Sequence, residues 1–321
     1  MIGANVITRA VEVLRQGGLV ALPTETVYGL AANAEDELAV RRIFAVKGRP
    51  SSHPLIVHLA DAEAWPGWAR AFPAEAKALA EAFWPGPLTL VLPRGPRALD
   101  AVTGGQDTVA LRVPGHPVAR EILKAFGGGV AAPSANRFGG VSPTTAEHVR
   151  RDLGSDVELV VDGGPCAVGV ESTIVDVSGD APALLRPGGV PREALERVLG
   201  RPVPQREKGP VRAPGMLESH YAPHAGVVLV EAAELASRTG ALAQSGQKVA
   251  ALAPAGWQAP TGVGVLEVPA DPEGFARVLY AMLREADVRG FDVVVVALPP
   301  ATGMGLAVRD RLTRAAAPRP G

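Results

Sequence analysis

Short runs of apolar residues alternate along the chain with stretches in which apolar residues recur at helical spacing. The apolar runs predict strands at residues 19–22, 55–59, 88–92, 109–113, 130–132, 159–161 and 173–177. The periodic stretches predict helices over residues 7–16, 37–46, 118–126 and 144–153. Asp36 is placed to cap the second helix, and Ser142 with Pro143 to open the last one. The first 200 residues therefore predict an α/β domain.

This pattern breaks after Gly200. The next 25 residues, 201–225, contain five prolines and show no periodicity, which is typical of a linker. A second α/β pattern then predicts strands at 227–230, 248–252, 263–268 and 292–297, and helices at 232–244, 273–288 and 306–316. We therefore predict a domain over residues 1–200, a linker over 201–226 and a small open-sheet α/β domain over 227–321.

Composition and charge limit the cellular compartments and the binding partners that can be expected for this protein. The formal net charge is -1, so strong bulk attraction to nucleic acid is not expected, and an RNA contact would need a local basic patch. The single cysteine, Cys166, excludes an internal disulfide and a cysteine-based metal cluster, which fits a reducing compartment. The N-terminus has no signal-peptide pattern, and no segment approaches the ~20 apolar residues of a membrane span. These features predict a cytoplasmic protein without a membrane partner.

Several standard sites are absent from the sequence. It contains no Walker-type phosphate loop, no G-x-G-x-x-G dinucleotide fingerprint, no H-E-x-x-H metal motif and no G-x-S-x-G nucleophile elbow. His220 and His224 stand four apart, but Pro223 between them argues against a helix that presents both to one metal. No protein metal site is therefore predicted.

Polar and cationic residues instead follow the apolar runs, next to Pro or Gly. The segments are His58 and residues 23–29 (PTETVYG), 47–50 (KGRP), 112–114 (RVP), 133–136 (PSAN), 171–173 (EST) and 186–189 (RPGG). Strand ends of α/β sheets are where ligands bind. Lys47 and Arg49, two apart on a glycine turn, suit a polyphosphate: the lysine supplies a point charge and the arginine a planar fork.

Each of these residues alone also has a plainer interpretation. Residues 47–49 suit a solvated helix end, where cations favour the helix dipole. Ser134 and Asn136 are common turn formers. His58 suits a half-buried imidazole, and Arg112 an ion-pair partner for a nearby glutamate. Their joint occurrence is what a functional interpretation has to explain.

Taken together, the motifs resemble those of the long form of threonylcarbamoyl-AMP synthase, whose catalytic part is called the YrdC-like domain. The matching segments run in order over residues 5–200: PTETVYG at 23–29, KGRP at 47–50, PLIVHL at 54–59, WPGPLTL at 84–90, ALRVPGHP at 110–117, APSAN at 132–136, SPT at 142–144, DGG at 162–164 with ESTIVD at 171–176, and LRPG at 185–188. PGM at 214–216 and HYAP at 220–223 are similar to the linker of the long form. The resemblance implies a YrdC-like domain with a twisted mixed sheet, plus a small C-terminal Rossmann-like open-sheet α/β domain.

The resemblance also implies an activity, that of a nucleotidyltransferase. The family carboxylates the amine of L-threonine with bicarbonate, and the carbamate then attacks the α-phosphorus of ATP, so that pyrophosphate leaves. ATP is expected to bring a bound Mg²⁺. The product, threonylcarbamoyl-AMP, is expected to pass to downstream tRNA threonylcarbamoyl-transfer proteins, and the chain itself to contact tRNA weakly.

Site residues carried over from the resemblance divide into two groups. Lys47 and Arg49 are the expected catalytic residues, because they would neutralise the triphosphate. The expected ATP-binding residues are Lys47, Arg49, His53, Thr108, Ser134, Asn136, Ser142, Arg186 and Tyr221. The expected L-threonine-binding residues are Thr26, His58, Arg112, Ala132 and Ser172.

Four of these expectations concern specific contacts. Arg112 would clamp the threonine carboxylate bidentately, and Tyr221 would fold back from the linker as a lid. Ser134, Ser142 and Thr108 would donate hydrogen bonds to phosphate oxygens. His53 stands where the family often has asparagine, and its imidazole can still donate to a phosphate.

Two competing functions remain at this stage. A non-catalytic module that binds double-stranded RNA or tRNA would use the concave surface of the domain, but the near-neutral charge argues against strong RNA affinity. A carbamoyl-transfer domain of the hydrogenase-maturation type would carry zinc-finger regions, which a single cysteine cannot supply.

Overall fold

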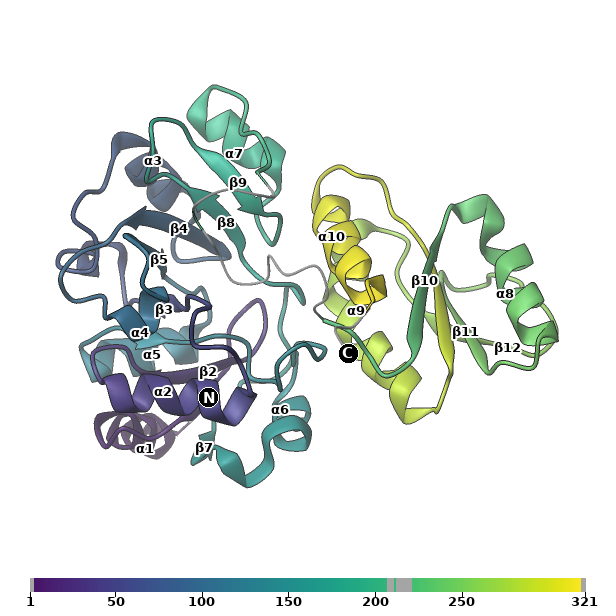
Figure 1. The fold of residues 1–321 in the computed structure, drawn as a ribbon, viewed down its shortest axis with the longest axis horizontal. Coiled ribbons are helices and arrows are strands. Elements are labelled where there is room, and N and C mark those ends of the chain that lie inside the picture. The colour runs from purple at the N-terminus through teal and green to yellow at the C-terminus, as the bar shows by residue number, and fades with distance from the viewer. Residues whose placement is uncertain (1–2, 207–210, 212–220, 319–321) are drawn as a thin grey trace.

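Two sheets organise the chain into a larger N-terminal unit and a smaller C-terminal unit (Figure 1). The computed structural model describes residues 3–206, 211 and 221–318. Within them, a nine-stranded mixed sheet has the order β7-β1-β2-β6-β3-β5-β4-β8-β9. Its strands are β1 (Val20–Leu22), β2 (Gly29–Asn33), β3 (Ile56–His58), β4 (Leu88–Pro93), β5 (Thr108–Arg112), β6 (Val130–Ala131), β7 (Leu159–Val160), β8 (Thr173–Asp176) and β9 (Ala183–Arg186).

Helices pack around this sheet. They are α1 (Ala4–Arg15), α2 (Glu37–Lys47), α3 (Ala74–Phe83), α4 (Asp100–Thr103), α5 (Pro117–Phe126), α6 (Ala146–Leu153) and α7 (Arg192–Leu199). The predicted cap of α2 is confirmed, because the Asp36 carboxylate accepts from the Leu38 and Ala39 amides. The predicted start of α6 is wrong. The capping residue is Thr145, while the Pro143 carbonyl accepts a hydrogen bond from the Tyr28 amide.

Five elements of this unit are not predicted by the sequence pattern: β2, β9, α3, α4 and α7. Strand β2 reads GLAAN, a run of small residues with little strand propensity, and burial between β1 and β6 is what makes it a strand. Tertiary packing thus decides its structure where local propensity does not.

The C-terminal unit has a four-stranded parallel sheet of order β10-β13-β11-β12. Its elements are β10 (Gly226–Val230), α8 (Leu235–Gln244), β11 (Val249–Ala253), β12 (Val263–Glu267), α9 (Pro272–Val288), β13 (Val293–Ala297) and α10 (Met304–Ala316). Helices α9 and α10 lie on the side of the sheet that faces the N-terminal unit, and α8 lies on the other side (Figure 1). All seven elements agree with the predicted ones to within a few residues.

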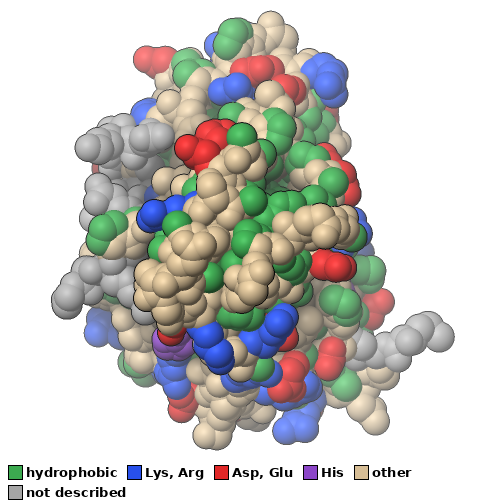
Figure 2. All heavy atoms as spheres, turned by 90° about the vertical axis from the view of Figure 1, so that its right-hand side faces the viewer, with side chains coloured by type: hydrophobic (Ala, Val, Ile, Leu, Met, Phe, Trp, Pro, Cys, Tyr) green, Lys and Arg blue, Asp and Glu red, His purple; other side chains and the backbone are tan. Residues whose placement is uncertain are grey.

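The outer side of this sheet is covered less completely. Figure 2 looks onto that end of the molecule, and hydrophobic side chains gather across its middle, with charged ones toward the edges. Val228, Val230, Val263 and Val265 are only partly buried on the side that packs against α8. The apolar core of the unit therefore lies mainly between the sheet and the pair α9 and α10.

The segment that joins the two units does not begin as an independent linker. The Leu184 amide of β9 donates to the Pro204 carbonyl, and the Arg206 amide donates to the Leu184 carbonyl, both at 2.9 Å. Residues 202–206 thus extend the edge of the large sheet. Residues 207–210 and 212–220, including the PGM segment and His220, lie outside the described residues, so the expected lid function of the linker stays a prediction.

The two units share a core. Val27, Val141 and Val170 of the N-terminal unit belong to the same buried apolar cluster as residues of α9 and α10. At the edge of this contact, Arg284 of α9 donates to the Asp152 carboxylate at 2.8 Å. The C-terminal unit is therefore docked by both apolar burial and an ion pair.

Candidate active site

A pocket opens at the carboxyl ends of β3 and β5, two neighbouring parallel strands. It leaves about 480 Å³ of empty space, part of it open to solvent. Its lining residues are Thr26, Val27, Arg49, Ile56, His58, Arg112, Ala132, Pro133, Ser134, Glu171, Ser172, Arg186 and Tyr221. Nine of these are residues that the sequence analysis assigned to substrates.

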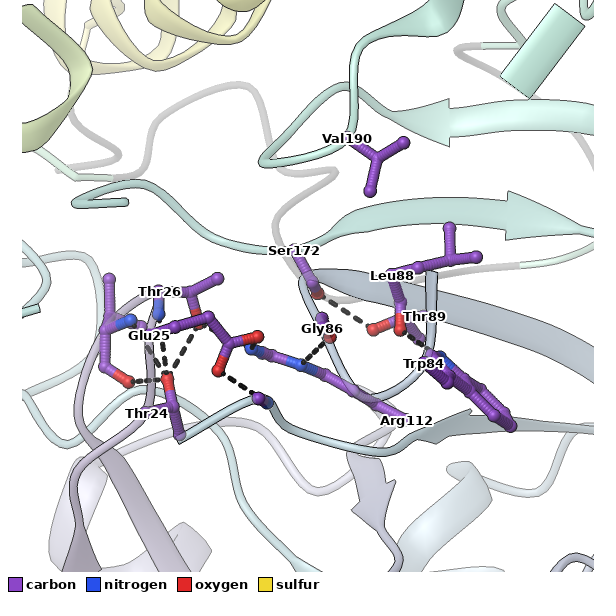
Figure 3. Close-up of polar contacts among 12 residues, drawn as sticks. Thr24, Glu25, Thr26, Trp84, Gly86, Leu88, Thr89, Arg112, Ser172 and Val190 are labelled. Carbon is purple, nitrogen blue, oxygen red and sulfur yellow. Dashed lines mark hydrogen bonds and ion pairs between the residues drawn. The ribbon is translucent and has the colours of Figure 1, made fainter. Parts of the chain in front are cut away.

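Arg112 lines one end of the pocket, and Glu25 lies beside it (Figure 3). Arg112 ends β5 and is buried, and its Nη2 donates to Glu25 Oε1 at 2.7 Å and to Thr26 Oγ1 at 2.9 Å. Its Nε donates to the Gly86 carbonyl at 3.3 Å. The other oxygen of Glu25 accepts from the Gly115 amide at 3.0 Å. Arg112 is therefore both an ion-pair partner and a pocket-lining cation, so the two interpretations of it are compatible.

His58 lies directly beside Arg112, its partner in the β3–β5 register. It is buried, and its Nδ1 has no hydrogen-bond partner within the described ranges. Burial, together with the nearby Arg112 charge, lowers the pKa of His58 to about 3. The imidazole is therefore neutral at physiological pH, and it presents an unused polar atom beside the pocket cation.

Ser172 and Arg186 close the same end from β8 and β9. The Ser172 and Thr89 hydroxyls lie 2.8 Å apart, as Figure 3 shows. Arg186 Nη2 donates to the Ser172 carbonyl at 2.8 Å and to its hydroxyl oxygen at 3.1 Å. Because that oxygen accepts from Arg186, the Ser172 proton is directed toward Thr89 or toward a ligand.

Lys47 lies one layer behind the pocket wall. It is the last residue of α2, and its Nζ donates to the Ser134 carbonyl at 2.6 Å and to the Asn136 carbonyl. Asn136 in turn donates to the carbonyls of Arg137 at 2.7 Å and Gly140 at 2.8 Å, while its buried Oδ1 has no partner in the described part of the chain. Burial and then the Arg49 charge lower the pKa of Lys47 well below its ordinary value.

Arg49 reaches the pocket because Gly48 ends α2 in the left-handed conformation, at φ +64°, and turns the chain. Its Nη2 donates to the Pro54 carbonyl at 3.0 Å, and its buried Nε has no partner among the described residues. Burial lowers the pKa of Arg49 to about 10, so the guanidinium remains charged at neutral pH. His53 does not line the pocket, and its ring lies 5.7 Å from the Phe138 ring, which Arg49 also faces.

Two other predicted residues are placed differently from the expectation. Thr108 begins β5 and so lies four residues, or roughly 13 Å, from Arg112 at the other end of the strand. Ser142 is buried, and its hydroxyl donates to Glu171 Oε1 at 2.6 Å. While it does so, that proton is not available to a phosphate oxygen. The expected phosphate contacts of both residues stay predictions.

Glu171 is a pocket residue to which the sequence analysis gave no role, although its EST segment was noted. Its Oε2 accepts from Tyr280 Oη at 2.8 Å and from Arg311 Nε at 2.6 Å. Tyr221 lines the pocket beside it, and its ring lies 5.7 Å from the Tyr280 ring. Nothing in the sequence indicates these partners, because Tyr280 and Arg311 follow Glu171 by 109 and 140 residues.

The carboxylates in and beside the pocket are both paired with arginines. Glu25 is paired with Arg112, and Glu171 with Arg311. Over the described residues, no group of three or more His, Cys, Asp or Glu side chains is arranged to hold a metal ion. Within the same ranges, none of the helices combines the length and apolar character that a membrane span requires.

Comparison with known proteins agrees with this geometry. A family model described as "Telomere recombination" matches residues 12–188, and one described as "Threonylcarbamoyl-AMP synthase, C-terminal domain" matches residues 190–317. The threonylcarbamoyl-AMP synthase of Pyrococcus abyssi is 42% identical over 94% of this chain and 91% of its own. That of Bacillus subtilis is 42% identical over 98% of this chain and 93% of its own.

This chain belongs to the threonylcarbamoyl-AMP synthase family. A solved structure described as P. abyssi Sua5 complexed with L-threonine superposes with a TM-score of 0.92 and 42% identity, covering 97% of this chain and 94% of that one. The family resemblance and the mixed α/β fold inferred from the motifs are thus confirmed. The catalytic interpretation is supported over that of a non-catalytic RNA-binding module, because the curated relatives of this family are named as synthases.

Proposed function

We propose that this chain condenses L-threonine, bicarbonate and ATP into threonylcarbamoyl-AMP and pyrophosphate. The observation that carries the proposal is a pocket with two chemically different halves. Arg112, His58 and Thr26 suit an amino acid at one end, and Arg49 and Arg186 suit phosphates beside it. Membership in the synthase family supports the same assignment.

In the amino-acid half, Arg112 would meet the threonine carboxylate. Glu25 and the Gly86 carbonyl hold its guanidinium in place, so little side-chain entropy remains to be lost on binding. The neutral His58 ring, whose Nδ1 has no partner among the described residues, would hold the amine. Hydroxyl groups of Thr26 and Ser172 would meet the threonine hydroxyl, so an analogue that lacks it would leave buried polar groups unpaired.

The reaction then has two bond-forming steps. The threonine nitrogen attacks the bicarbonate carbon, and water leaves, which gives a carbamate. A carbamate oxygen attacks the α-phosphorus of ATP, the bond to the β-phosphate oxygen breaks, and pyrophosphate departs with the electron pair. Such a transfer depends on positioning and on neutralisation of charge more than on acid–base groups.

In the nucleotide half, Arg49 and Arg186 line the pocket and Lys47 stands behind Ser134. Lys47 would act by shifting from the Ser134 and Asn136 carbonyls toward the phosphates, whose negative charge would favour its protonated form. Buried atoms of Arg49 and Asn136 that have no partner in the described part of the chain support a polar ligand here. We also assign Ala132 to the threonine contact through its backbone, and Tyr221 to the nucleotide.

Mg²⁺ would arrive bound to the nucleotide phosphates, where it would neutralise charge, since the carboxylates of Glu25 and Glu171 are both paired with arginines. The product would pass to separate proteins that transfer the threonylcarbamoyl group to tRNA, and the cytoplasm is the proposed location. A net charge of -1 supports at most weak direct contact with tRNA.

A direct test is incubation of the purified protein with ATP, bicarbonate and labelled threonine. Labelled threonylcarbamoyl-AMP should form, and pyrophosphate should appear only when threonine and bicarbonate are both present. Equal pyrophosphate release without threonine would identify a different ATP-hydrolysing activity.

A further inference from the structure

Side chains of the C-terminal unit reach the wall of the pocket from behind. Tyr280 of α9 and Arg311 of α10 both donate to Glu171 Oε2, at 2.8 and 2.6 Å. Neither residue lines the pocket, but Glu171 does. The third donor, Ser142, belongs to the N-terminal unit, as Glu171 does. The Glu171 carboxylate therefore joins the two units at the site itself.

Arg311 is the counter-ion that stabilises the charge of this buried carboxylate. Glu171 is buried, and the Arg311 side chain is 0% exposed. Burial alone would raise the pKa of Glu171, but the Arg311 and Arg186 charges and the Ser142 hydrogen bond outweigh it and lower that pKa to about 2. Without Arg311, a pocket proposed to hold ATP would present either an uncompensated negative charge or a protonated carboxyl group.

Arg311 also contacts Tyr221. The guanidinium carbon lies 5.2 Å from the centre of the Tyr221 ring, within cation–π range, and the Tyr280 ring flanks the same tyrosine. Tyr221 has φ +63°, a left-handed conformation that is strained for an aromatic residue. Such a backbone persists only where the surroundings enforce it. Here those surroundings include Arg311 and Tyr280.

We propose that Arg311 is a positioning residue of the active site: it fixes the Glu171 carboxylate and the Tyr221 ring in the pocket wall, so that the nucleotide half is complete only with the C-terminal unit in place. This inference rests on the proposed synthase function. It assigns the C-terminal unit a part in ATP binding, through Glu171 and Tyr221, beyond that of an appended domain.

Steady-state kinetics of pyrophosphate release test the proposal in the full-length protein. Arg311→Gln should raise the KM for ATP on the order of 10- to 100-fold, as small misplacements within a site can do, and change the KM for threonine little. Arg311→Lys should recover part of the loss, because it restores the charge but not the planar contact with Tyr221. Circular dichroism and thermal unfolding verify the fold of each variant.

Arg284→Gln is the matched control. Arg284 is likewise a buried arginine of the C-terminal unit that pairs with a carboxylate of the N-terminal unit, Asp152, but it does not touch Glu171 or Tyr221. Its loss should lower the melting temperature and leave the ratio of the two KM values unchanged, because the shared apolar core keeps the units docked.

Measuring the KM for ATP at several pH values distinguishes a positioning role of Arg311 from a general loss of structure in the variant. The groups that face Glu171 or its arginine are Ser142, Arg186, Tyr221, Tyr280, Arg311 and Asp310. In Arg311→Gln, Glu171 loses its main counter-ion, so its pKa rises. The ratio of the variant KM for ATP to the wild-type value should then fall as the pH is lowered from 8 to about 5.5, since protonation removes the unpaired charge. ATP itself also titrates in this pH range, but this affects both proteins equally and therefore cancels in the ratio of the two KM values.

The double variant Glu171→Gln/Arg311→Gln removes both charges of the buried pair, so neither is left without a partner. It can therefore be used for the test if the single variant misfolds. Its KM for ATP should stay raised, because Tyr221 has lost its cation, and should follow the wild-type pH dependence. The inference is overturned if Arg311→Gln behaves like Arg284→Gln, or if the double variant has the wild-type KM. An inactive wild-type protein would instead refute the proposed function.

Discussion

The guanidinium of Arg112 is paired with the carboxylate of Glu25 at 2.7 Å, with both side chains largely buried beside the pocket. The pair holds a cation in a fixed orientation before substrate arrives. A buried pair of this kind contributes little net stability by itself, because desolvation offsets the attraction. Its value here is geometric, since the guanidinium is already oriented toward the pocket.

Replacement of Arg112 by lysine should therefore impair threonine use selectively. An ammonium group cannot bind Glu25, Thr26 and a carboxylate in one plane, so the KM for threonine should rise on the order of 10- to 100-fold while the KM for ATP changes little. Arg150→Lys is the control, because Arg150 pairs with Asp162 at a half-exposed position. A rise in the KM for ATP alone would mean that the two halves of the pocket are interchanged.

Lys47→Met and Arg49→Ala should each lower the rate of product formation on the order of 10²- to 10³-fold, as expected for loss of a preorganised cation at a phosphoryl centre. Methionine is chosen at position 47 because it fills the buried volume of lysine without its charge. Arg41→Ala, at an exposed position on the same helix, should have no effect. Near-normal turnover in both variants would remove these residues from the mechanism.

ATP binding should be coupled to proton uptake by Lys47. Burial and Arg49 lower the pKa of this amine well below its ordinary value, and an approaching polyphosphate would raise it again. The binding heat should therefore depend on the ionisation enthalpy of the buffer, most clearly at alkaline pH. Calorimetry on Lys47→Met provides the reference, because the titration of the nucleotide itself is common to both proteins. Equal proton uptake by the two proteins would contradict the assignment.

Some of this arrangement could be predicted from sequence and some could not. Strand β13 was predicted because a run of valines has strong strand propensity, and α2 because Asp36 caps a periodic segment. Strand β2 was missed because it is a strand only through its buried neighbours. The pairing of Glu171 with Arg311 was missed for a different reason: the residues are 140 apart, and no local pattern encodes how two units dock.

A substitution at Gly169 tests how closely α9 packs against the N-terminal unit. It has φ +83°, and a β-carbon there would lie 2.4 Å from the Arg277 Cα, in the backbone of α9. Gly164 has nearly the same φ, +82°, but a β-carbon there would meet nothing within 4 Å. Alanine at either position carries the backbone strain, so the further loss of stability in Gly169→Ala, about 1–3 kcal/mol, measures the clash. Thermal unfolding of both variants gives this difference, and equal losses would show that α9 is free to move away.

His58 should contribute a stability that decreases on acidification below its ordinary pKa of 6.5. Its ordinary pKa is 6.5, and burial followed by the Arg112 charge lowers the folded-state pKa to about 3. Between these values the unfolded chain binds a proton that the folded protein does not, so the free energy of unfolding falls as the pH falls. Between pH 6.5 and 5 the loss should be on the order of 1.5 kcal/mol. Glu171, with a folded-state pKa of about 2 and an ordinary value of 4.5, has its effect only below that window.

The measurement is urea unfolding at several pH values for the wild type and His58→Gln. The variant should show a smaller decrease in the free energy of unfolding over this window, even if its absolute stability is lower. His148 also has a lowered pKa, to about 4, and contributes with the same sign. His148→Gln should therefore remove a separate part of the slope, and the double variant should combine both reductions, because the two rings titrate at different places in the fold. Identical slopes in the wild type and His58→Gln would show that His58 can be protonated in the folded state, and the neutral imidazole proposed for the threonine amine would then be wrong.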